Sequence, residues 1–219
     1  MKINKIQLNI IKNNEVGQVI NGGSKEDNTG AIIAPDGISI QHVNGKFYTT
    51  DDWVAKGFTN EEANGVALKT IDCGFVIANK NIPYKKWSSN TNNLIDGILT
   101  TTIASEAKMD FAGLSNTELM LKTDTSGAAY CCNSYKFPNG VNGYLPALGE
   151  LDYILQNRDS LNYALELIGG KNIIPGNPIW SSTQYSATDA WVNFNKQIDH
   201  LGKDQEYTCF IVILSALPT

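Results

Sequence analysis

The segment between Trp180 and Trp191 holds the densest group of side chains that could recognise a ligand. It contains two tryptophans, a tyrosine and five serine or threonine residues. Aromatic rings give rigid stacking area, and short hydroxyl groups give adaptable hydrogen bonds at a low entropic cost. The segment has neither a strand nor a helix period, so we expect a loop surface that contacts a partner. The tryptophans either stack on that partner or lie buried as anchors beneath the surface, and the second interpretation fits the usual burial of tryptophan better.

The side chains that could act as nucleophiles do not form a recognisable catalytic group. The chain has four cysteines, which are Cys73, Cys131, Cys132 and Cys209. They lack metal-ligand spacing, and no basic residues cluster near them to stabilise a thiolate, so we expect free, buried thiols and no zinc site. His42 and His200 have no serine or cysteine in a recognisable frame, and we expect both at the surface. The sequence therefore predicts a protein that is not an enzyme.

The overall composition limits the partners that such a surface can have. The chain of 219 residues has a formal net charge of −5, with 42% hydrophobic and 18% charged residues. The negative charge and the lack of a basic cluster argue against nucleic acid and against an anionic membrane as partners. No apolar stretch reaches the roughly 18 residues of a membrane span, and residues 1–10 alternate between polar and apolar, unlike a signal peptide. The possible partners that remain are a sugar, a neutral surface or another protein.

Helix signals are clearest in the middle of the chain, before the aromatic segment. The first long helix is expected after Pro146, which suits a first helical position, and its apolar stripe consists of Leu148, Leu151 and Leu155. The second is expected from Asp159, and its stripe consists of Leu161, Ala164, Leu165 and Ile168. Shorter helices are expected after Thr49 and at the capping boxes Thr59–Glu62 and Ser115–Glu118. The two stripes predict helices that pack on the core.

Strand signals frame these helices at both ends of the chain. Residues 6–10 place isoleucine and leucine at period two, and the Pro-Asp-Gly turn at 35–37 between two apolar runs indicates a hairpin. The run Tyr207–Leu217 is the most apolar in the chain and indicates a core strand. We expect residues 1–40 to form an N-terminal β region for attachment or oligomerisation, with an edge sheet of the main domain as the alternative. Residues 41–219 are expected to form one domain.

Taken in order, several motifs resemble the C-type-lectin-fold domains of gut bacteria and their phages. They are Gly143–Glu150 (GYLPALGE), a helical stretch, Trp180–Tyr185 (WSSTQY), Asp189–Trp191 and a terminal apolar strand. This group is related in fold to formylglycine-generating enzymes and to the variable proteins of diversity-generating retroelements. The likeness covers roughly residues 40–217. It implies an α+β architecture, the C-type lectin fold, in which two helices flank small antiparallel sheets and a loop-rich face binds the ligand.

The resemblance also implies which residues contact that ligand. In diversified relatives, the variable positions lie between the Trp-Ser-Ser-Thr segment and the last strand. Carried onto matching positions and joined by two neighbouring aromatics, the implied ligand-binding residues are Gln184, Tyr185, Ser186, Thr188, Asp189, Trp191, Asn193, Asn195, Gln197, Asp199, His200, Lys203, Asp204 and Glu206. Relatives usually end in a Tyr-x-Val-Arg pattern, whereas Tyr207–Leu214 contains no arginine. No role that depends on that arginine is therefore carried over.

The cofactors of related folds are not expected here. Calcium, the usual cofactor of sugar-binding lectins, needs six to eight oxygen ligands with several carboxylates converging. The carboxylates that could supply some of them are Asp189, Asp199, Asp204 and Glu206. However, the Glu-Pro-Asn and Trp-Asn-Asp signatures are both absent. An oxidase of the formylglycine-generating type needs a reactive cysteine pair, which the sequence does not indicate. We expect no metal and no cofactor.

These inferences predict a non-enzymatic binding protein of a phage or prophage of a gut bacterium. Residues 180–206 would contact a host-surface protein or glycan, and repeated copies would add avidity. A virion location with other virion proteins as partners is expected, because the chain shows no signal peptide and virion proteins assemble in the cytoplasm. A homo-oligomer is expected, with a trimer as the first guess by analogy alone. The alternative is a structural tail or capsid protein with no host ligand, and whether residues 180–206 are diversified stays open.

Overall fold

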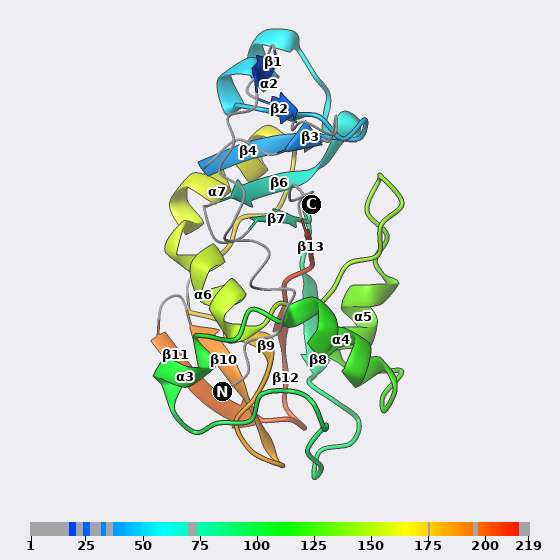
Figure 1. Cartoon of the computed structure of the whole chain (residues 1–219), viewed down its shortest axis with the longest axis vertical. Helices are drawn as coiled ribbons and strands as arrows, with labels where there is room; N and C mark the ends of the chain where they lie inside the picture. The colour runs from blue at the N-terminus through cyan, green and yellow to red at the C-terminus, as the bar shows by residue number, and fades with distance from the viewer. Residues whose placement is uncertain are drawn as a thin grey trace.

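The chain folds into an α+β protein of helices and β-sheets (Figure 1). Its buried apolar side chains form two large hydrophobic cores. The computed structural model describes residues 18–20, 24–26, 32–33, 37–69, 74–174, 176–194 and 197–214. The strand predicted at residues 6–10, together with Cys73 and Asn195, lies outside these ranges. Within them, none of the helices combines the length and the apolar character that a membrane crossing needs.

One five-stranded sheet, the upper sheet of Figure 1, is antiparallel throughout. Its strands in spatial order are β13 (Val212–Leu214), β7 (Gly74–Ile77), β6 (Ala63–Lys69), β4 (Gly37–His42) and β5 (Phe47–Tyr48). The helix α7 (Arg158–Leu167) packs against β4 and β6, and α2 (Thr50–Lys56) contacts β4 and β5. Leu68 and Phe75 of the sheet share a buried core with Leu161 and Leu165 of α7.

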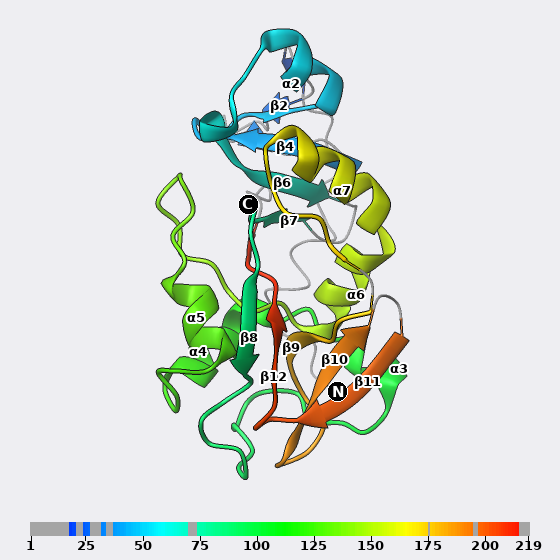
Figure 2. The ribbon, with the colours of Figure 1, turned by 180° about the vertical axis from the view of Figure 1, so that it is seen from behind.

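The second five-stranded sheet, the lower sheet, positions the aromatic segment. Its strands in spatial order are β11 (Gln197–Gly202), β10 (Asp189–Phe194), β9 (Ile179–Gln184), β12 (Glu206–Cys209) and β8 (Ile82–Lys86). Neighbours run antiparallel except β9 and β12, which pair in parallel at Ile179 and Thr208. Two helices, α4 (Gly113–Leu121) and α5 (Ala128–Ser134), lie on the β8 side of this sheet (Figure 2). They enclose a second core that includes Trp87, Met120 and Trp180.

The C-terminal run connects the two sheets. The strand β12 belongs to the lower sheet, and after two residues the chain continues as β13 in the upper sheet (Figure 1). The single core strand predicted for Tyr207–Leu217 is therefore two short strands in different sheets. Phe210 and Ile211 between them are buried, at 1% exposed each, so the connection itself is part of the core.

The two long predicted helices are confirmed. The helix α6 (Leu148–Gln156) buries Leu148, Leu151 and Leu155 completely, and α7 buries Leu161, Ala164 and Leu165. The Thr49 hydroxyl accepts the N–H of Asp52 at the start of α2, and the Thr59–Glu62 box caps a short 3₁₀ helix, Asn60–Glu62. The box predicted at Ser115 is wrong, because α4 begins at Gly113 and the Ser115 hydroxyl donates to the Ala112 carbonyl oxygen.

The strongest correction concerns the aromatic segment, which we expected to be a loop. Most of it forms β9 and β10, joined by a short turn at 185–188. All six residues of β9 are buried, so the strand lacks the polar and apolar alternation of a half-exposed strand. The hairpin predicted around 35–37 is also wrong, because the apolar runs on its two sides enter different sheets. The turn signal at residues 35–37 did not indicate with which strands the neighbouring runs would pair.

A third sheet precedes the main body. It contains β1 (Gln18–Ile20), β2 (Ser24–Glu26) and β3 (Ile32–Ile33), all antiparallel. The boundary drawn at residue 40 falls inside β4, so residues 37–40 belong to the upper sheet. A role of the small sheet in attachment remains a prediction.

Candidate functional site

The motifs Gly143–Glu150 and Trp180–Tyr185 contact each other in the buried interior between α6 and β9. The N–H of Leu148 donates to the hydroxyl of Thr183 at 2.9 Å, and that hydroxyl donates to the Asp110 carboxylate at 2.8 Å. The N–H of Ser182 donates to the carbonyl oxygen of Pro146 at 2.8 Å. These bonds join the start of α6 to the middle of β9. They therefore fix the strand from which the candidate site emerges.

Two carboxylates are buried beside this junction. Glu150 is 1% exposed and accepts the N–H of Ala147 at 2.8 Å, and Asp110 accepts the side-chain amide of Asn116 at 3.0 Å. Burial raises the pKa of Glu150 to about 8, and the charge of Asp110 adds to the shift. Burial raises the pKa of Asp110 as well. Neither acid reaches the surface, so both belong to the scaffold.

A stack of aromatic rings lies where the β10–β11 hairpin meets the end of β9. The rings of Tyr185 and His200 are parallel within 9°, with centroids 3.6 Å apart. Trp191 packs edge-on against Tyr185 at 5.0 Å, and its Nε1–H donates to the carbonyl oxygen of Thr101 at 2.9 Å. Trp180 and Trp191 are 0% and 4% exposed, which confirms their interpretation as buried anchors. The half-buried Tyr185 and His200 thus rest on a fixed support.

A carboxylate and two hydroxyls lie next to this stack. The Asp189 carboxylate accepts from the Ser186 hydroxyl at 3.0 Å and from the Thr188 hydroxyl at 2.5 Å. Its other oxygen lies 3.7 Å from Nδ1 of His200. The hydrogen bond from Thr188 lowers the pKa of Asp189 below its usual value, so the carboxylate is ionised at neutral pH. Together these groups present acceptors and hydroxyls beside an aromatic surface.

A buried lysine holds the turns that carry these groups. Nζ of Lys203 donates to the carbonyl oxygens of Asn93 and Ala187, at 3.1 and 3.0 Å, and to Oε1 of Gln184 at 3.3 Å. It also lies 4.6 Å from the centre of the Trp87 ring. Burial lowers the pKa of Lys203 to about 8. This one side chain connects three segments at the same end of the lower sheet.

Four of the predicted ligand-binding residues are buried, and a role in direct contact does not fit this structure. They are Gln184, Asn193 and Lys203, each 0% exposed, and Trp191. The amide of Gln184 binds both the N–H and the carbonyl oxygen of Ile95, and the amide of Asn193 donates to Asp152 at 3.1 Å. Because their polar atoms have partners inside the fold, these side chains support the surface instead of forming it.

The exposed candidates divide between two sides of the hairpin. His200 is paired with Trp191 in the strand register. Successive side chains of a strand point to opposite faces, so the side chains of the exposed Gln197 and Asp199 of β11 lie on the face opposite the His200 ring. The following turn and strand expose two more acids, Asp204 and Glu206. The residues that the structure gathers together, which we call the hairpin face, are Tyr185, Ser186, Thr188, Asp189 and His200.

Sequence reasoning missed a loop that borders the hairpin face. The carbonyl oxygen of Leu99 accepts the N–H of Gln184 at 3.1 Å, and Thr101 accepts from Trp191 as described above. This loop leads into the short helix α3 (Ala104–Ala107) and exposes apolar side chains. They are Leu94, Leu99 and Ile103, which are 55%, 40% and 52% exposed. Their sequence has no period, so nothing in it indicated that they would lie at the surface beside the hairpin.

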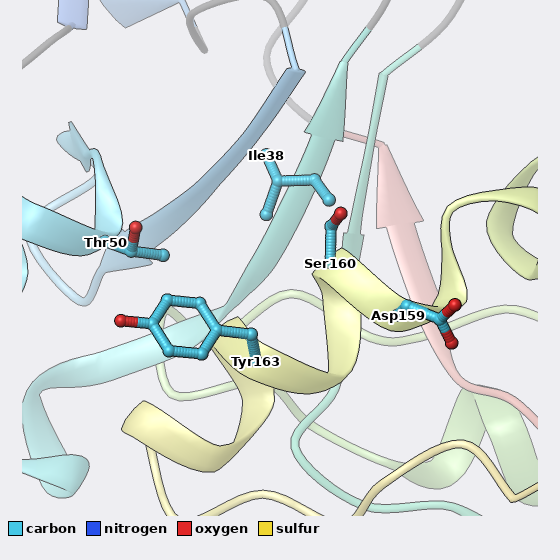
Figure 3. A pocket seen from close by; sticks show the side chains of 5 residues that line it. All are labelled: Ile38, Thr50, Asp159, Ser160 and Tyr163. Carbon is cyan, nitrogen blue, oxygen red and sulfur yellow. The ribbon is translucent and has the colours of Figure 1, made fainter.

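Metal chemistry and enclosed pockets do not mark this site. In the part of the chain that the structure describes, His, Cys, Asp and Glu side chains form no group of three that could hold a metal ion. A depression of about 430 Å³ lies elsewhere, between β4, α2 and α7, and is lined by Ile38, Thr50, Asp159, Ser160 and Tyr163 (Figure 3). A second depression, of about 530 Å³, lies beside β8 and β12. Neither is lined by a residue of the hairpin face.

Comparison with known proteins gives a likeness of fold only. No family model and no curated protein match the chain. Among solved structures, the chain is similar to a fimbrial protein from Bacteroides ovatus ATCC 8483, with a TM-score of 0.51 and 16% sequence identity. The match covers 88% of this chain and 48% of that protein, so the chain spans about half of its length. At this identity the likeness concerns the arrangement of helices and strands.

Proposed function

We propose that the protein is a non-enzymatic binding protein that contacts a host-surface protein or glycan through its hairpin face. The observation that carries this proposal is the flat stack of Tyr185 on His200, supported from below by the buried Trp191. A surface that is ordered before binding loses little entropy when a partner docks on it. The oxygen atoms of Ser186, Thr188 and Asp189 beside the stack supply directional hydrogen bonds.

The charge around the hairpin face narrows the class of partner. Among the residues that the structure describes around this face, the basic Lys203 is buried, whereas the acids are accessible. The accessible acids on and around the hairpin are Asp189, Asp199, Asp204 and Glu206. Like charges across an interface are costly, so an anionic partner is disfavoured. A neutral glycan or a protein surface with basic groups fits this end of the molecule.

The C-type lectin fold is part of the same proposal. It is supported by the consecutive helices α6 and α7, by the small antiparallel sheets and by the return of β13 to pair with β7. Diversification by a retroelement is proposed for the exposed positions only. Changes at Thr188 or Asp199 would leave the core intact, whereas changes at the buried Gln184 or Asn193 would remove internal hydrogen bonds.

The assembly that carries the protein is proposed to be a phage or prophage virion, in which a homo-oligomer would add avidity. The small sheet β1–β3 would then serve for attachment to other virion proteins. The alternative within a virion is a structural tail or capsid protein without a host ligand. A second candidate, an adhesin of a fimbria-like surface structure, is favoured by the likeness to a fimbrial protein.

The test is binding of the purified protein to a panel of intact gut-bacterial strains. The proposal predicts binding to some strains and not to others. Treatment of binding cells with protease or with periodate then separates a protein partner from a glycan partner, because each treatment destroys one class. A folded, oligomeric protein that binds no strain would favour the structural virion protein instead.

A further inference from the structure

The second depression lies away from the hairpin face and has the size of a small-molecule site. Its volume of about 530 Å³ falls within the range of roughly 300–1,000 Å³ that such sites occupy. The floor is formed by Ile179, Thr208 and Phe210, at the place where β9 and β12 pair in parallel. One wall comes from Asn81 and Tyr84, and the other comes from the end of α7 and the residues between α7 and β9, which are Glu166, Gly170, Lys171, Asn172, Ile174 and Asn177. We call it the β8 groove (the strands around it are labelled in Figure 2).

An irregularity in β8 directs an aromatic ring into this groove. In the pairing of β8 with β12, Lys85 pairs with Tyr207 and Ile82 pairs with Cys209. Two residues of β8, Pro83 and Tyr84, therefore lie opposite one residue of β12, Thr208. Such a bulge bends the strand and re-aims a side chain. Tyr84 has φ of 51°, and among the described residues it is the one non-glycine with positive φ. Its side chain is 66% exposed.

This backbone is costly for a tyrosine and needs a reason. The left-handed region suits glycine, and strained backbone of this kind clusters at active sites, ligand clamps and switch regions. Tyr84 makes no hydrogen bond or ring contact with the described part of the chain that would explain the conformation. The conformation exposes the Tyr84 ring at the edge of the β8 groove.

The other groups that line the β8 groove are uncharged or balanced in charge. The side-chain amides of Asn81 and Asn177 have no hydrogen-bond partner among the described residues. Lys171 and Glu166 carry opposite charges, so their sum is zero. Ile174, which is 68% exposed, adds apolar surface. An aromatic ring with free amides and apolar surface matches a neutral, hydroxyl-rich ring, whose CH face stacks on the aromatic ring while its hydroxyls bind the amides.

The bulge also argues against an extended peptide as the occupant. The strand β8 is the last of its sheet, and a peptide could add to a regular edge of this kind. A bulge interrupts the ladder of backbone hydrogen bonds that such an addition needs. We propose that the β8 groove binds one neutral pyranose unit of a saccharide, with Tyr84 as the stacking platform and Asn81 and Asn177 as hydroxyl-binding groups. This site goes beyond the proposed function, because none of its residues belongs to the hairpin face.

The test is saturation-transfer-difference NMR of the full chain with the methyl glycosides of glucose, galactose, mannose, fucose and N-acetylglucosamine. Transfer to at least one of them is expected. The decisive variant is Tyr84→Gly, because it removes the ring and relieves the left-handed backbone together. It should abolish the transfer while Tm stays equal to that of the wild type or rises. Combined Asn81→Ala and Asn177→Ala substitutions should weaken binding at least tenfold.

Two controls make the result specific. Tyr163→Ala removes another exposed tyrosine, at the depression of Figure 3, and should leave transfer unchanged. Because the hairpin face is itself proposed to contact a protein or a glycan, the Tyr84→Gly comparison is repeated in the hairpin-face variant Tyr185→Ala with His200→Ala. There the transfer that remains should come from the β8 groove, and Tyr84→Gly should abolish it, so failure of either site is seen separately. No transfer to any glycoside, undiminished transfer in Tyr84→Gly, or stronger binding of glucuronate or glucosamine than of the neutral sugars would overturn the proposal.

Discussion

Nζ of Lys203 lies 3.3 Å from Oε1 of Gln184, and both side chains are 0% exposed. The same ammonium reaches the carbonyl oxygens of Asn93 and Ala187, which belong to two different loops. One buried cation therefore holds together the loops around the hairpin face. The shape of this surface depends on residues that do not touch a ligand.

Replacing Lys203 with methionine should destabilise the protein by about 2 kcal/mol or more, because it removes the donor of two part-buried carbonyl oxygens, those of Asn93 and Ala187. It also removes one of the donors to the buried Oε1 of Gln184, which keeps the N–H of Ile95. The free energy of unfolding in urea measures this change. The matched control is Lys136→Met, whose side chain is exposed and which should change stability by less than about 0.5 kcal/mol. Equal stability of the wild type and Lys203→Met would show that the ammonium does not organise these loops.

Glu150 should make stability depend on pH. Its pKa is about 8 in the folded protein against 4.5 ordinarily, so the folded state keeps a proton that the unfolded state releases. Its stabilising contribution is complete below pH 4.5 and is lost as the pH rises through 8. The loss amounts to at most about 5 kcal/mol. Unfolding in urea across this pH range measures it.

The contribution of Glu150 is isolated by comparison with Glu150→Gln, which cannot titrate. The free energy of unfolding of the wild type, relative to that of Glu150→Gln, should fall by several kcal/mol as the pH rises from 4.5 to 8. The effect of pH on stability has the opposite sign for Lys203, because its pKa falls from 10.5 to about 8 on folding. Lys203 therefore adds stability only as the pH rises above 8. Parallel pH profiles for the wild type and Glu150→Gln would contradict the assignment.

Gly149 should tolerate no side chain, because the start of α6 approaches another backbone there. A Cβ at this position would lie 2.4 Å from the carbonyl oxygen of Lys108 and 2.7 Å from that of Asp110. Gly149→Ala should therefore cost about 2 kcal/mol or more, measured by thermal or urea unfolding. Gly202→Ala is the control, because its Cβ would meet the Asp204 carboxylate, which can turn away. Similar losses for both would contradict this explanation of the motif.

The parts of the fold that the sequence predicted are those in which a local pattern meets a single buried face. The helices α6 and α7 each carry an apolar stripe, and both stripes are buried. The strand β9 was missed because it is buried along its whole length and shows no alternation. The run from Tyr207 was predicted as one strand because hydrophobicity alone does not tell which sheet each half will join.

The sequence pointed to a region for the candidate site but not to which of its side chains are buried. Two of the residues that the Gln184 side chain binds, Ile95 and Thr100, lie more than eighty positions earlier, and no local pattern reveals such contacts. A polar residue between aromatic residues looks the same in sequence whether it faces solvent or a buried amide. The left-handed Tyr84 was equally hidden, because nothing in a Pro-Tyr pair predicts a bulge against β12.

The measurement that tests the central claim most directly is the affinity for cells of a binding strain, compared between two matched double variants. One replaces Tyr185 and His200 on the hairpin face with alanine, and the other replaces Gln197 and Asp199 on the opposite side of the same hairpin. Losing a preformed aromatic contact at an interface typically costs about 1–2 kcal/mol or more. The account predicts at least a tenfold loss for the first variant and less than a twofold change for the second, with both folded. Equal affinity of the first variant and the wild type would contradict it.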